Sequence, residues 1–108
     1  MRYKNKPLTP AKRGTVNEFR NIALYHLSII TPQGKFFEDD VEFLSAPGKE
    51  GIFNVLANHT PMISLLKEGT LRIKTNGIEQ SFPATQGILE VNPEHKVLIL
   101  LDAHPQSS

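Results

Sequence analysis

Apolar and polar residues alternate with a period of two along much of the chain from position 24 onward. In residues 25–29 the apolar positions are 25, 27 and 29, whereas positions 26 and 28 are polar. Residues 71–74 alternate in the same way, and Asn76-Gly77 follows them after one residue. A period of two places successive side chains on opposite faces of a strand, and Asn-Gly is typical of a two-residue hairpin turn. The pattern therefore predicts half-buried strands joined by tight turns.

The remaining apolar segments are separated by residues that favour turns. Two apolar runs, 87–91 and 97–101, flank an Asn-Pro dipeptide and predict a second hairpin. The five consecutive apolar residues at 97–101 indicate a strand that is covered on both faces. Residues 62–68 are the segment expected to form a helical turn. Further strands are expected at 35–38, 41–46, 52–56 and 78–82.

This succession of short strands predicts an all-β fold. Seven or more strands with closely spaced turns favour a two-sheet antiparallel β-sandwich, because one short helical turn cannot cover a parallel sheet. We expect the sandwich to span residues 23–104, preceded by a flexible basic tail at 1–22 and followed by a short C-terminal tail at 105–108. The whole chain of 108 residues has the length of one domain.

The net charge of +1 conceals an unequal distribution. Residues 1–22 carry six basic residues and one acidic residue, whereas the rest of the chain carries six basic and ten acidic residues. The tail therefore has a net charge of +5 and the body −4. A basic segment interrupted by Pro and Gly is typical of a disordered leader or an added segment. The alternative function is a stand-alone β-sandwich module that binds nucleic acid or another anion through this tail.

No motif in the sequence indicates an enzyme, a cofactor site or a metal site. Gly48-Lys49-Glu50-Gly51 lacks the spacing of a phosphate-binding loop, and the four histidines form no adjacent ligand pair. The absence of cysteine excludes thiol chemistry and favours a reducing compartment. The acidic run 38–40 is interpreted as a solvated turn, with a site for a hard cation as the alternative. We therefore expect a non-catalytic protein without a cofactor or a bound metal.

An ordered series of short motifs gives a family resemblance. Tyr-His-Leu opens the first strand at 25–27, Asn-His-Thr-Pro stands at 58–61, and Gly-Ile-Leu-Glu-Val stands at 87–91. With these motifs in this order and spacing, residues 24–102 resemble the N-terminal β-sandwich of the epsilon subunit of bacterial and chloroplast-type F-type ATP synthases. The resemblance does not extend to the basic tail.

The resemblance implies a structural role in the central stalk of the ATP synthase rotor. The family's subunit binds the gamma subunit and the c-ring and couples proton-driven rotation to ATP synthesis elsewhere in the complex. In bacteria it is peripheral, on the cytoplasmic side of the inner membrane. Most relatives continue into a helical hairpin that inhibits hydrolysis and in some binds ATP. Because the sequence stops at Ser108, we expect this chain to lack both properties.

The resemblance also implies which residues contact partners. Many relatives have an acidic residue where this chain has Ile52, so Glu50 is the nearest carboxylate for a charge contact with the c-ring. From the residues alone, His59 is interpreted either as a hydrogen-bonded structural side chain or as part of a contact surface. Either face of the sandwich is compatible with gamma binding. The predicted contact residues are Gly48, Lys49, Glu50, Gly51, Ile52, Phe53, Asn58 and His59.

Overall fold

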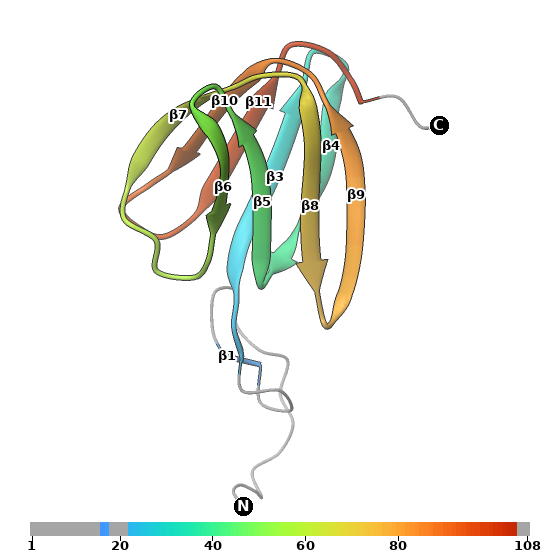
Figure 1. Cartoon of the computed structure of the whole chain (residues 1–108). Coiled ribbons are helices and arrows are strands. Elements are labelled where there is room, and N and C mark those ends of the chain that lie inside the picture. The colour runs from blue at the N-terminus through green and yellow to red at the C-terminus, as the bar shows by residue number, and fades with distance from the viewer. Residues whose placement is uncertain (1–15, 18–21, 106–108) are drawn as a thin grey trace, which may run out of the picture.

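The computed structural model describes residues 16–17 and 22–105 (Figure 1). Within them the chain forms eleven strands, and none of it forms a helix suited to crossing a membrane. The predicted tail at 1–22 lies largely outside these residues, but β1 pairs with β2 in an antiparallel manner. The strands are β1 (Val16–Asn17), β2 (Ile22–Ala23), β3 (Tyr25–Thr31), β4 (Gly34–Val41), β5 (Phe43–Gly48), β6 (Gly51–Val55), β7 (Met62–Leu66), β8 (Gly69–Thr75), β9 (Ile78–Ala84), β10 (Gly87–Val91) and β11 (Val97–Leu101).

Nine strands form one hydrogen-bonded sheet that curls into two facing layers (Figure 1). The first layer runs β4-β3-β11-β10-β7, and the second layer contains β5, β8 and β9, with β6 paired to the other side of β5. The layers join where Gly48 pairs with Leu66. All neighbouring pairs are antiparallel except β3 and β11, which are parallel. The predicted all-β sandwich is confirmed, although its two sheets are continuous and one pair is parallel.

The core lies between the two layers and is built from alternate residues of each strand. Leu27 and Ile29 of β3 face this core from the first layer, and Leu71 and Ile73 of β8 face it from the second. All four are fully buried. Each such side chain contributes roughly 1.5–3 kcal/mol through burial of its apolar surface. The alternation seen in the sequence is therefore the alternation between core and surface.

Tyr25 ties the first layer to the second through a buried hydrogen bond. Its hydroxyl donates to the carbonyl oxygen of Val55 at 2.7 Å, and burial raises the pKa of the phenol. We expect Tyr25→Phe to lower the free energy of unfolding by about 1–3 kcal/mol, because the Val55 carbonyl loses its donor while the ring stays in place. Urea unfolding followed by circular dichroism measures this difference. An unchanged midpoint would show that the hydroxyl adds nothing to stability.

Residues 62–68, predicted as a helical turn, instead contain strand β7. Five residues of β7 pair in register with β10, from Met62 opposite Val91 to Leu66 opposite Gly87. Along β7 the exposed Ile63 and Leu65 alternate with less exposed neighbours, as the two faces of a strand require. The helix prediction was therefore wrong.

The acidic run 38–40, interpreted as a turn, continues strand β4. Its residues pair with β3, with Asp39 opposite Leu27 and Asp40 opposite His26. Because β4 is an edge strand of the sheet, its carboxylates stay in contact with water while the backbone is paired. Charged side chains on an edge strand also discourage pairing with another chain. The turn interpretation was wrong because solvated side chains do not require an irregular backbone, and here the backbone is paired with β3.

Candidate interaction surface

The β5–β6 hairpin carries six of the eight predicted contact residues. Lys49 and Glu50 form its two-residue loop between paired glycines, and the second of these, Gly51, has a φ of 135° that favours glycine. Ile52 follows and is 77% exposed. Phe53 instead packs against the core. The hairpin tip therefore exposes two charged side chains and one apolar side chain, whereas Phe53 packs against the core.

Asn58 and His59 lie at the other end of β6 from the hairpin tip. The five residues of β6 span roughly 17 Å at the usual rise of a strand. Asn58 has a φ of 66°, and His59 Nδ1 donates to the carbonyl oxygen of Thr60 at 2.8 Å. This local hydrogen bond favours the structural interpretation of His59. The structure thus separates the eight predicted residues into two groups at opposite ends of the sandwich.

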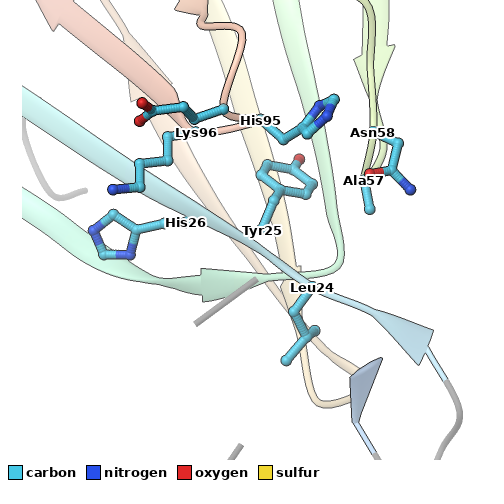
Figure 2. A pocket seen from close by; sticks show the side chains of 8 residues that line it. Leu24, Tyr25, His26, Ala57, Asn58, His95 and Lys96 are labelled. Atoms are coloured by element: carbon cyan, nitrogen blue, oxygen red, sulfur yellow. The ribbon is translucent and has the colours of Figure 1, made fainter. Parts of the chain in front are cut away.

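Asn58 lines a polar hollow of about 160 Å³ at its end of the sandwich (Figure 2). Figure 2 shows the His95 ring above the Tyr25 ring, with Asn58 beyond it on the neighbouring loop. The turn that carries His95 is held by Asn92, whose Oδ1 accepts hydrogen bonds from two backbone amides. The hollow therefore joins the loop after β6 to the β10–β11 turn. It is lined by Leu24, Tyr25, His26, Ala57, Asn58, Glu94, His95 and Lys96.

A charged cluster lies on the outer face of β3 and β4. His26 Nε2 lies 2.7 Å from a Glu38 carboxylate oxygen, and His26 Nδ1 lies 3.2 Å from an Asp40 carboxylate oxygen. Lys35 contacts the other Glu38 oxygen. Across the described ranges, no three or more His, Cys, Asp and Glu side chains are arranged to hold a metal ion. The cluster is therefore a set of ion pairs and hydrogen bonds between two neighbouring strands.

This cluster makes stability depend on pH in acid. Hydrogen bonds from Lys35 and His26 lower the pKa of Glu38 from 4.5 to about 2. Folding thus favours the ionised carboxylate, so its stabilisation is complete above about pH 4.5 and is lost as the pH falls towards 2. We expect the urea midpoint of the wild-type protein to fall more than that of Glu38→Gln over this range. If the urea midpoints of the two proteins fell equally over this pH range, the assignment to Glu38 would be contradicted.

An apolar row crosses the outer face of the first layer. Leu65 on β7 pairs with Ile88 on β10, which pairs with Leu100 on β11. Leu100 in turn pairs with Ile30 on β3. Leu65, Ile88 and Leu100 are 51%, 41% and 44% exposed. With their neighbours on the same face, these residues form an outer patch that consists of Ile30, Ile63, Leu65, Ile88, Leu98 and Leu100.

The outer patch corrects the prediction that the strand at 97–101 is covered on both faces. Val97, Ile99 and Leu101 are buried against the core, whereas Leu100 faces outward. Strand β11 lies between β10 and β3, so it is not an edge strand, but no described residues cover its outer face. Contiguous exposed apolar surface of this kind is typical of interaction sites. The predicted contact residues did not include this patch. The unbroken apolar run at 97–101 was the feature of the sequence that indicated it.

The sequence of this domain matches a known family over most of its length. The match covers residues 24–105 and is to the family described as ATP synthase, Delta/Epsilon chain, beta-sandwich domain. This chain belongs to that family. The matched range begins just before β3 and ends after β11, so it includes the outer patch, the β5–β6 hairpin and the whole core.

Two curated relatives of the family are ATP synthase epsilon chains. The protein of Pelotomaculum thermopropionicum is 46% identical over 77 residues, which cover 71% of this chain and 57% of that protein. The protein of Caulobacter vibrioides is 37% identical over 73 residues, which cover 68% of this chain and 85% of that protein. The match thus spans little more than half of the first relative and most of the second.

Two solved structures of ATP synthases share the fold. A chain in the mitochondrial enzyme of Euglena gracilis, solved as OSCP/F1/c-ring, superposes with a TM-score of 0.70 at 23% identity, covering 91% of this chain and 71% of its own. A chain in the central stalk and c-ring of the mitochondrial ATP synthase of Tetrahymena thermophila superposes with a TM-score of 0.64 at 17% identity. The superposition covers 71% of this chain and 62% of that chain. At these identities the comparison establishes the family fold.

Proposed function

We propose that this chain is an epsilon-type subunit of the central stalk of an F-type ATP synthase. It is non-catalytic and binds the gamma subunit and the c-ring. It couples proton-driven rotation of the ring to ATP synthesis elsewhere in the complex. The observation that carries the proposal is the outer patch, which gives a β-sandwich of this family a surface suited to a protein partner.

The outer patch is the proposed gamma-binding surface. Its apolar side chains follow one another across four adjacent strands, so a single partner surface covers all of them at once. Burying exposed apolar area is the main favourable contribution to most protein association. The patch has Glu90 within it and the His26 cluster beside it, which gives the apolar centre a polar border. Such a border is typical of stable interfaces.

The β5–β6 hairpin tip is the proposed c-ring contact. The tip lies at one end of the sandwich (Figure 1), and it carries exposed charges at Lys49 and Glu50. Asn58 and His59 lie at the opposite end, so they do not belong to this contact. A subunit held against the c-ring lies at the membrane surface without entering it. We therefore place the protein on the cytoplasmic side of the bacterial inner membrane, as a peripheral part of the complex.

Native mass spectrometry of this chain with gamma from the same source tests the proposed function. We expect a one-to-one complex from the full chain and from a variant that lacks residues 1–21, because the outer patch is present in both. If neither protein binds gamma while a longer epsilon chain does, the stalk role is wrong. The alternative, a nucleic-acid-binding module, instead predicts salt-dependent binding to a polyanion that disappears when residues 1–21 are removed.

A further inference from the structure

A hollow of about 250 Å³ opens at the edge of the outer patch, between the β5–β6 hairpin and the start of β10. Leu65 and Ile88 of the patch form part of its wall, and Gly87 of β10 lies between β7 and β11. Lys49 and Asp102 bring one positive and one negative charge to its lining. The hollow is lined by Lys49, Leu65, Leu66, Gln86, Gly87, Ile88 and Asp102.

The backbone holds both charged residues in place. The amide of Lys49 donates to the carbonyl oxygen of Leu65 at 3.0 Å, and the amide of Asp102 donates to that of Gln86 at 2.9 Å. Each charged residue is thus tied to a strand or loop that forms the wall. In the part of the chain that the structure describes, neither side chain has an ion pair or hydrogen bond. An ammonium and a carboxylate therefore remain available to an incoming group.

We propose that this hollow receives a tyrosine side chain of the subunit that covers the outer patch, which is gamma in the function proposed above. A cavity of about 150 Å³ lined by aliphatic and aromatic side chains accommodates benzene, so the hollow has room for a phenol ring. The ring contacts Leu65 and Ile88. Its hydroxyl donates to the Asp102 carboxylate and accepts from the Lys49 ammonium.

The balance of charge selects a neutral polar ring over other side chains. Lys49 and Asp102 cancel each other, so an arginine or a glutamate in the hollow leaves one charge uncompensated as water is excluded. A phenylalanine fills the same space but leaves both charged groups without a partner. Tyrosine is also among the residues that dominate binding energy at interfaces, where it fills a pocket with its ring and uses its hydroxyl for specificity.

The hollow is first tested on the full chain alone with p-cresol, the tyrosine side chain as a free molecule, and with toluene as its matched control. We expect p-cresol to shift the amide NMR signals of Lys49, Ile88 and Asp102, and toluene to bind at least threefold more weakly. Asp102→Ala is expected to remove this preference. Equal affinities for the two probes, or shifts elsewhere on the protein, would overturn the proposed recognition of a phenol.

The second test measures the affinity of gamma for variants of the full chain. Lys49→Ala and Asp102→Ala are each expected to weaken binding about tenfold, in line with a hydrogen bond to a charged group. The affinity loss of the double variant should be smaller than the product of the two single-variant losses, because both groups bind one hydroxyl. Lys74→Ala and Asp39→Ala, which remove the same charges outside the hollow and the patch, should stay within twofold of the wild type.

These measurements distinguish a failure of the proposed tyrosine site from a failure of the stalk function on which that proposal rests. If gamma binds and the two hollow variants bind it as tightly as the controls do, the tyrosine anchor is wrong and the stalk function stands. If the wild-type chain does not bind gamma, the stalk function is wrong, and the p-cresol titration still decides whether the hollow recognises a phenol.

Discussion

Replacing Gly87 with alanine is expected to lower the free energy of unfolding by about 3 kcal/mol. A Cβ at this position would lie 2.2 Å from the carbonyl oxygen of Leu100 and 3.0 Å from a methyl carbon of Leu101. The first of these atoms belongs to the backbone of β11, so a side-chain rotation cannot relieve the clash. The β10–β11 ladder must shift instead, and forcing extra volume into packed structure costs about this much.

Urea unfolding of Gly87→Ala beside Gln86→Ala checks this expectation. Gln86 is the preceding residue and is exposed, so its truncation should leave the midpoint near that of the wild type. Because Gly87 pairs with both Leu101 and Leu66, the distortion in Gly87→Ala reaches three strands. Equal midpoints for the two variants would show that the ladder absorbs the added carbon without strain.

Local sequence chemistry was enough to predict most strands and turns. Alternation identified β3 and β8, and the Asn76-Gly77 turn has a positive φ at both residues, 52° and 78°, as a tight hairpin requires. The prediction for residues 62–68, which contain β7, was wrong because a short apolar run fits a helical turn as well as a buried strand. Its pairing with β10, more than twenty residues later in the chain, decides the matter, and no local pattern contains that information.

The candidate site was predictable only where its residues are close in the sequence. The family resemblance implied the contact at Lys49 and Glu50, and the local sequence predicted the loop that carries them because its glycines and charged residues form one continuous segment. The outer patch was not predicted, because Ile30, Leu65 and Leu100 come from distant strands and are aligned by the register of the curled sheet. The placement of His59 away from the hairpin likewise depends on the direction in which β6 runs.

Replacing Leu100 with aspartate is expected to weaken gamma binding by about a hundredfold or more. Leu100 lies near the centre of the apolar row, between Ile88 and Ile30. A carboxylate there becomes buried without a partner when gamma covers the patch, and an uncompensated buried charge costs several kcal/mol. Because Leu100 faces away from the core, the substitution should preserve the fold, which circular dichroism and urea unfolding of the free chain will verify.

The matched control is Ile78→Asp, which places the same charge on an exposed apolar strand residue. Ile78 is 66% exposed on β9, in the second layer and outside the outer patch. Calorimetric titration with gamma should give the wild-type affinity for Ile78→Asp, while Leu100→Asp shows the large loss. If both variants lose affinity equally, gamma binds through charge or shape shared by both layers rather than through the patch. If neither variant loses affinity, the first layer is not the gamma-binding surface, and the apolar row must serve another partner.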